Sequence, residues 1–327
     1  MEFLTLDFLG KPAWMWLAFM AIVAALLALD LGVLHRKQRE IGVGESLALS
    51  AVYVALGLAF GGWVWWYMGE TAGMNYLTGF VVEKSLAMDN VFVIAMIFTY
   101  FAVPRLYQHR VLFWGILGVI VLRAVMIGVG AALVEQFGWL LYIFAAFLIF
   151  TGIKMWAMAD REYDVAGSPV LKWAYRRFRV TEGLHGERFW VSQPDAASGR
   201  LAWHMTPLFL ALLMVEFVDV VFAVDSVPAI FAITTDPFIV YTSNIFAILG
   251  LRALYFALSA MVARFHYLKY ALALLLVFIG SKIFVADALG LGKIPPAISL
   301  GITFAILAGG TLFSMWKTAP PRAAEAA

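Results

Sequence analysis

Two apolar stretches of the sequence carry side chains that could bind a metal ion. Their oxygen-bearing residues are Glu83, Asp89 and Asn90 in the first, and Glu216, Asp219, Asp225 and Ser226 in the second. Hard divalent ions such as Mg²⁺, Ca²⁺ and Mn²⁺ prefer carboxylate and other oxygen ligands. Zinc and copper are disfavoured, because the chain has no cysteine and its 5 histidines lie at the ends of the apolar stretches or in loops.

The elements that must position these side chains are membrane helices. Apolar residues make up 64% of the 327-residue chain, charged residues only 13%, and the mean hydropathy is +0.90. A soluble domain has about 25% charged residues. The composition therefore excludes a soluble globular enzyme, a disordered chain and a coiled coil, and a net charge of +2 gives no basic surface for nucleic acid. We expect an all-α, polytopic membrane bundle.

Stretches of about 20 apolar residues, the length that spans a bilayer, recur along the chain. They predict nine spans, near 13–34, 45–67, 74–101, 110–134, 139–158, 206–233, 238–263, 267–288 and 294–316. The one sizeable polar loop, 159–205, includes the basic and aromatic segment 170–178, for which we expect an interfacial amphipathic helix. The alternative is an ordinary tethered loop of mixed charge.

Lysine and arginine predict the orientation of these spans, because cytoplasmic loops are enriched in them. With the N-terminus outside, the inside segments hold nearly all basic residues of the loops, including those at 36–39, 105–110, 161–200, 264–269 and 317–322. The outside holds only Lys11 and Lys293. We therefore expect the N-terminus outside and the C-terminus in the cytoplasm.

Polar residues recur in the same order in two parts of the chain. The matched pairs are Glu83 with Asp219, Asp89 with Asp225, Asn90 with Ser226, Arg123 with Arg252, and Lys154 with Lys282. They predict an inverted repeat of three spans, an arrangement common in transporters. The expected division is a two-span segment at 1–73, repeats at 74–158 and 206–288, the loop at 159–205, and a last span with a tail at 289–327.

An ionised side chain costs at least ~2.5–3.5 kcal/mol at the bilayer centre unless it is paired or hydrated. The predicted spans also contain the bases Lys84, Arg123, Lys154, Arg252 and Lys282. We expect Arg123, Arg252, Lys154 and Lys282 to pair with acids or backbone carbonyls. The alternative is that a lysine neutralises an empty cation site and is displaced when the ion arrives.

Two of the acids have less certain surroundings. Asp225 lies six residues beyond Asp219, so a straight helix would turn the two side chains roughly 120° apart. Pro228 permits a kink or an unwound turn that could bring Asp225 back. Asp30, near the inner end of the first span, is either a further ligand, a gate or an interfacial acid.

The two acidic segments, 83–90 and 216–234, resemble the signatures of the TerC family of membrane proteins, and loop details are closest to its Alx-like branch. The resemblance runs from about residue 29 to about residue 315. It implies a bacterial inner-membrane protein of manganese homeostasis, with Mn²⁺ export as the activity. It places the family's acidic positions on Glu83, Asp89, Glu216, Asp219 and Asp225, with Asp30 as a further candidate.

The combined expectation is a transporter that carries Mn²⁺ outward, with a proton as a chemically available counter-ion. Asp89 and Asp225 would be central ligands, with Asn90 and Ser226 as neutral oxygen donors. Enzymatic motifs such as GxSxG, HExxH and the phosphate-binding loop are absent from the sequence, so we expect no enzyme. The alternatives are another hard divalent ion, chiefly Ca²⁺, and a membrane scaffold or metal-dependent regulator that transports nothing.

Overall fold

The computed structural model describes residues 6–32, 42–159, 164–194, 200–258, 267–290 and 294–318, without the side chains of 30–32 and Arg252. Some sequence predictions therefore fall outside the described residues. These are the side chain of Asp30 as a ligand, His35, His266 and the orientation signals at 36–39, Arg161, Arg264, Lys293 and Arg322.

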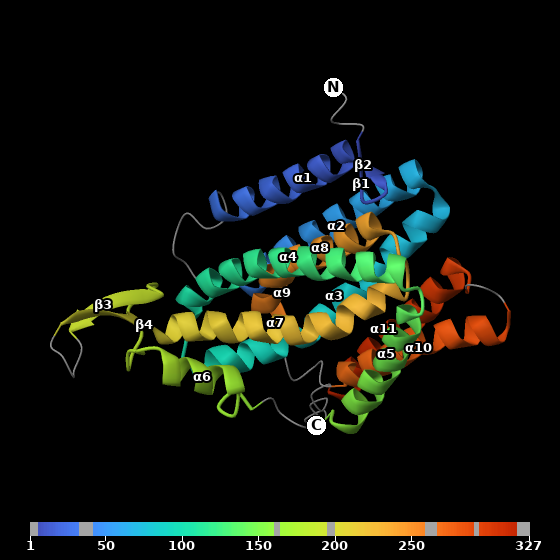
Figure 1. Ribbon diagram of the computed structural model, residues 1–327. Helices are drawn as coiled ribbons and strands as arrows, with labels where there is room; N and C mark the ends of the chain where they lie inside the picture. The colour runs from blue at the N-terminus through green and yellow to red at the C-terminus, as the bar shows by residue number, and fades with distance from the viewer. Residues whose placement is uncertain are drawn as a thin grey trace, which may run out of the picture.

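Helices dominate the part of the chain that the structure describes (Figure 1). Their bounds are α1 Ala13–Gly32, α2 Val43–Met68, α3 Glu70–Tyr100, α4 Arg105–Gln136, α5 Leu140–Ala157, α6 Pro169–Arg177, α7 Pro207–Phe231, α8 Pro237–Leu249, α9 Leu251–Leu258, α10 Leu268–Ala288 and α11 Pro296–Lys317. The strands form two antiparallel hairpins, β1 Asp7–Phe8 with β2 Lys11–Pro12, and β3 Trp190–Pro194 with β4 Leu201–Met205.

Among the described residues, 6 helices are long and apolar enough to cross a membrane, namely α2, α4, α5, α7, α10 and α11. Helix α3 has 31 residues but carries Glu70, Glu83, Lys84 and Asp89. Helix α8 has only 13 residues, ends at Gly250 and is buried from Phe238 to Leu249. The bundle thus uses apolar sequence for its interior as well as for lipid contact, and nine spans stay a prediction.

Two helices begin at N-cap residues of the types that favour this position, threonine and aspartate. Thr206 accepts a hydrogen bond from the Phe209 amide at the start of α7, and Asp236 accepts hydrogen bonds from the Phe238 and Ile239 amides at the start of α8. A proline occupies the first turn in both cases, where its missing N–H costs nothing. These caps fix where the chain re-enters the bundle.

Helix α7 runs without interruption through Pro228 to Phe231. The unwound turn that Pro228 could permit is therefore not present, and the structure corrects that expectation. Proline removes one hydrogen bond, but burial of the flanking residues Ser226, Val227 and Ala229 stabilises the helical conformation there. Asp219 and Asp225 consequently keep the different directions that a continuous helix gives them.

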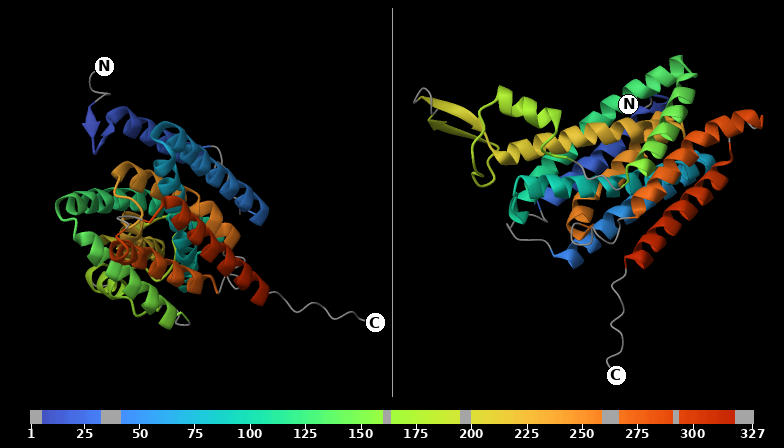
Figure 2. Two further views of the ribbon diagram at one scale, coloured as in Figure 1. Left: turned by 90° about the vertical axis from the view of Figure 1, so that its right-hand side faces the viewer. Right: turned by 90° about the horizontal axis from the view of Figure 1, so that it is seen from below.

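The helices that carry the acids lie inside the bundle. Helix α3 packs against α2, α7, α8 and α11, and α7 packs against α3, α4 and α5. Helices α5 and α10 form a close pair (Figure 2). Figure 2 also shows α2 and α11 on the outside of the bundle. Helix α7 is buried on one side only and exposes Val220, Val221 and Val224.

The polar segment between α5 and α7 contains both helix and strand. Helix α6 buries Leu171 and Ala174 and packs against α7, while Trp173 and Tyr175 are exposed. Hairpin β3–β4 projects beyond the beginning of α7 (Figures 1 and 2). This hairpin was not expected from the sequence, but the described residues are mostly helical, as predicted. The expected helix is present, whereas its place at a membrane surface stays a prediction.

Candidate metal-binding site

A small cavity between α3, α4, α5, α7 and α10 brings together most of the residues expected to bind metal. Its volume is about 20 Å³, enough for one water-sized species. Its lining residues are Glu83, Leu86, Asp89, Asn90, Arg123, Met155, Phe222, Asp225, Ser226 and Leu276. Both members of two matched pairs, Asp89 with Asp225 and Asn90 with Ser226, therefore lie at one place although they are far apart in the sequence.

Arg123 of α4 forms the centre of a buried polar network beside this cavity. Its Nη2 lies 2.7 Å from Oε1 of Glu83, and both side chains are only 3% exposed. Its Nη1 donates to Oε2 of Glu83 at 3.3 Å, to Oδ1 of Asn244 at 2.7 Å and to Oγ of Ser226. The guanidinium thus holds two of the expected metal ligands, Glu83 and Ser226.

Asp225 is half-buried and takes part in a different set of contacts. Its Oδ1 accepts a hydrogen bond of 3.2 Å from Oγ1 of Thr151 on α5, and Lys154, one turn further along α5, interacts with it electrostatically. Asp89 has Lys269 of α10 as its electrostatic partner. The two aspartates therefore interact electrostatically with basic residues of different helices, Asp225 with Lys154 of α5 and Asp89 with Lys269 of α10.

Glu216 and Asp219 lie outside the lining of the cavity. The Glu216 carboxylate packs so closely on Gly118 of α4 that a Cβ there would clash with it. Asp219 is buried and interacts electrostatically with Glu216, Arg123 and Glu83. Within the described residues, no three or more His, Cys, Asp or Glu side chains lie close enough to hold one ion together. Metal binding by the eight expected residues stays a prediction.

Two other bases inside the bundle contact neutral oxygens. Nζ of Lys84 donates to the carbonyl oxygen of Ala247 at 3.1 Å, and Nζ of Lys282 donates to Oγ of Ser299 at 3.4 Å. The expected pairing with acids or carbonyls is therefore confirmed for Arg123, whereas the contact of Lys282 shown here is to a hydroxyl.

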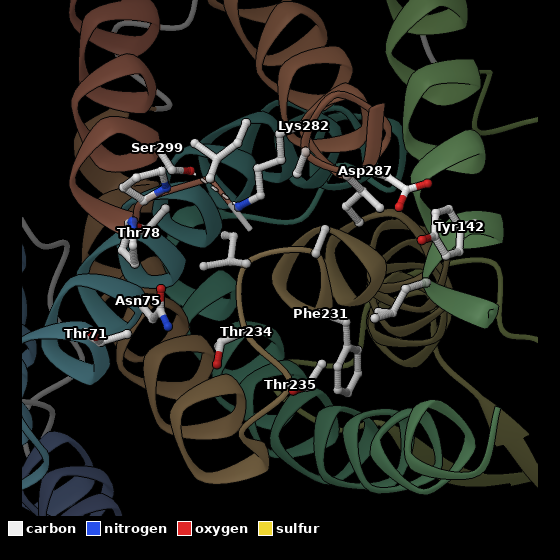
Figure 3. Close-up of a pocket in the computed structure, with 18 residues that line it drawn as sticks. Thr71, Asn75, Thr78, Tyr142, Phe231, Thr234, Thr235, Lys282, Asp287 and Ser299 are labelled. Carbon is white, nitrogen blue, oxygen red and sulfur yellow. Dashed lines mark hydrogen bonds between the residues drawn. The ribbon is translucent and has the colours of Figure 1, made fainter. Parts of the chain in front are cut away.

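A larger pocket of about 390 Å³ lies toward the end of the bundle where α7 and α10 end and α3, α5 and α11 begin. Figure 3 shows Lys282 pointing into it, with Thr71, Asn75 and Thr78 of α3 on one wall and Asp287 near Tyr142 on another. Thr234 follows the end of α7 and completes the polar lining. We call this pocket the vestibule.

One apolar layer separates the vestibule from the small cavity. Val82 of α3, Ala229 of α7 and Ile279 of α10 are 2%, 0% and 1% exposed and belong to one hydrophobic cluster. On each helix, the layer residue lies between one that lines the vestibule and one that lines the small cavity. The lining residues of the two are five or six positions apart on each helix, and a helix rises about 1.5 Å per residue, so the vestibule and the cavity are roughly 7.5–9 Å apart.

Two residues of the site were not predicted from the sequence. Asn244 is fully buried and accepts a hydrogen bond from Arg123. Thr151 donates a hydrogen bond to Asp225. A buried amide inside an apolar helix was the available signal for Asn244. The sequence gave no such signal for Thr151, because a threonine hydroxyl in a helix commonly donates its hydrogen bond to a backbone carbonyl of the same helix.

The fold and the buried carboxylates define an integral, multi-pass helical membrane protein. The family model described as "Integral membrane protein TerC family" matches residues 68–321, and the chain belongs to this family. The resemblance seen in the two acidic segments is thereby confirmed.

Relatives cover nearly the whole chain. A Myxococcus xanthus protein described as "Uncharacterized membrane protein STKORF319" is 45% identical over 324 residues, 98% of each chain. The Escherichia coli (strain K12) protein described as "Putative membrane-bound redox modulator Alx" is 46% identical over 316 residues, 94% of this chain and 95% of the relative. A Rickettsia bellii membrane protein is 46% identical over 300 residues, 92% of this chain and 96% of the relative. No solved structure matches the chain.

Proposed function

We propose that this chain transports a hard divalent cation, and that its activity is export of Mn²⁺ across the bacterial inner membrane. The observation that carries the proposal is the shared cavity of Asp89 and Asp225, which come from two different helices, α3 and α7. Among the described residues, three carboxylates line the cavity, and Arg123 forms an ion pair with one of them, Glu83. The other two, Asp89 and Asp225, form no ion pair with Arg123. Two carboxylates and the neutral oxygens of Asn90 and Ser226 suit a hard divalent ion.

The vestibule supports a transport role over a closed binding site. It leads from one end of the bundle to within one apolar layer of the cavity, and apolar constrictions are a means by which membrane pathways close. In the proposed cycle, one three-helix repeat moves against the other and opens that layer. The proposed orientation has the N-terminus outside and the C-terminus in the cytoplasm, so that the vestibule is the exit on the outside.

A proton is the proposed counter-ion, because paired carboxylates in a small cavity can exchange protons for metal. Ca²⁺ is the alternative cargo, since it accepts the same oxygen ligands. Several relatives are described as membrane-bound redox modulators. This chain has no cysteine, so we propose no thiol redox chemistry for it, and we propose that it is not an enzyme.

Flux of Mn²⁺ into proteoliposomes, with and without a pH gradient, tests the proposal. Wild type is compared with D89N and D225N, and with D164N, which removes the charge of an exposed aspartate that does not line the cavity. We expect flux for wild type and D164N and none for folded D89N and D225N. A folded wild type without flux of Mn²⁺ or Ca²⁺ under either gradient would favour the scaffold or regulator instead.

A further inference from the structure

Arg123 occupies oxygens that a cation in the small cavity would need. Its guanidinium donates to both oxygens of Glu83 and to Oγ of Ser226, and all three residues line the cavity. A divalent ion bound beside this guanidinium would be repelled by it and would have to share the Glu83 carboxylate with it. Arg123 and the ion therefore compete for the same ligands.

The network around Arg123 is not closed. Nε of Arg123 and Nδ2 of Asn244 are buried polar atoms without a hydrogen-bond partner in the structure. Buried donors are nearly always satisfied in native proteins, and an orphan donor calls for an explanation. The arrangement around Glu83 therefore leaves one donor of the guanidinium, Nε, without an acceptor.

A second buried carboxylate interacts electrostatically with the guanidinium and does not line the cavity. This is Asp219, which is 7% exposed and also interacts electrostatically with Glu83. Among the described residues, no side chain donates a hydrogen bond to it. A buried carboxylate of this kind is costly unless a cation compensates it. Asp219 could therefore form an ion pair with Arg123 when the ion pair between Arg123 and Glu83 breaks.

Resting on the proposed function, we propose that Arg123 is a tethered cation that exchanges with the transported ion. In one state it pairs with Glu83 and Ser226 and excludes the ion from these oxygens. In the other it pairs with Asp219, held by Asn244, and Glu83 and Ser226 face the ion together with Asp89 and Asp225. Asp219 is then a positioning residue that acts through Arg123 and does not touch the metal.

A double-mutant cycle on Mn²⁺ affinity tests this exchange. Titration calorimetry on purified protein compares wild type, D219N, R123Q and R123Q/D219N, with D164N as the control. We expect D219N to bind Mn²⁺ at least tenfold more weakly, because Arg123 then stays on Glu83. We expect R123Q and R123Q/D219N to bind equally tightly, because Asp219 has no effect once Arg123 is gone. The same weakening by D219N in both backgrounds would make Asp219 a ligand and overturn the exchange.

R123Q could fail to fold, because it leaves Glu83 without its cation. The comparison is therefore repeated in R123Q/E83Q, which removes the buried pair as a whole, and there D219N is again expected to change the affinity less than twofold. A tenfold effect in this background would overturn the exchange. Absence of Mn²⁺ binding by wild type, or unchanged binding by D225N, would overturn the proposed function as well, which separates the two failures.

Discussion

Gly152 of α5 and Gly280 of α10 occupy reciprocal positions in one interface. A Cβ added to Gly152 would lie 2.6 Å from the carbonyl oxygen of Ala273, and one added to Gly280 would lie 2.5 Å from that of Ala145. The later residue of α5, Gly152, lies beside the earlier part of α10, and the later residue of α10, Gly280, lies beside the earlier part of α5. The two helices therefore run antiparallel. This is the contact that an inverted repeat requires at its axis, although the repeat itself stays a prediction.

The first prediction concerns this interface. G152A and G280A are expected to lower the stability of the protein by about 1–3 kcal/mol each, because the added methyl meets backbone of the partner helix, which cannot rotate away. The control is G128A in α4, where no atom lies within 4 Å of the added Cβ. Thermal unfolding in detergent, followed by tryptophan fluorescence, gives the comparison. If G152A and G280A unfold at the temperature of G128A, the interface is looser than described.

The second prediction concerns the buried ion pair. E83A is expected to lose about 3–5 kcal/mol of stability, since it leaves Arg123 charged and buried without its carboxylate. R123M/E83M removes both charges and is expected to be markedly more stable than E83A. Thermal unfolding of the three proteins decides this. A double variant as unstable as E83A would mean that the polar network, and not the charge balance, stabilises this region.

The third prediction concerns Thr151. T151V keeps the shape of the side chain but removes the donor to Asp225. A hydrogen bond to a charged group contributes about 1.5–3 kcal/mol, so Mn²⁺ affinity is expected to fall roughly tenfold. T151S is expected to restore it. T99V is the control, because Thr99 bonds only to the Ala95 carbonyl of its own helix, at the exposed end of α3. Equal affinity of T151V and T99V would remove Thr151 from the site.

The fourth prediction concerns the vestibule and the orientation. Because the chain has no cysteine, single substitutions report directly on exposure to a membrane-impermeant thiol reagent. N75C in the vestibule is expected to react in intact cells, and V82C in the apolar layer is expected to react far more slowly. S192C on β3 is expected to react only after the cells are opened. Labelling of S192C in intact cells would reverse the proposed orientation.

The fifth prediction concerns the start of α8. Asp236 caps this helix and also lies 2.9 Å from Nζ of Lys11. D236A is expected to lower stability by about 1 kcal/mol through loss of the cap. D236N keeps a capping oxygen, so it is expected to lose only the partly exposed ion pair, less than about 1 kcal/mol, as is K11Q. Thermal unfolding of the three variants tests this order, and a larger loss in K11Q than in D236A would contradict it.

The class of protein and much of the content of the cavity can be predicted from the sequence. Too little charge and too many apolar residues leave only a membrane bundle, and Thr206-Pro207 and Asp236-Pro237 mark helix starts through local hydrogen bonds. Glu83, Asp89, Asn90, Asp225 and Ser226 could be grouped in advance, because costly buried oxygens on apolar helices must face one another.

Which of these groups contact one another depends on the packing of the helices. Arg123 pairs with Glu83 because α4 presents it to α3, and Asp219 lies outside the cavity because α7 continues as a helix through Pro228. Thr151, Asn244 and the packing of Glu216 on Gly118 depend on how neighbouring helices are rotated and shifted along their axes. The hydrophobic pattern specifies that a helix is buried, but many rotations bury it equally well, and packing of side chains selects one.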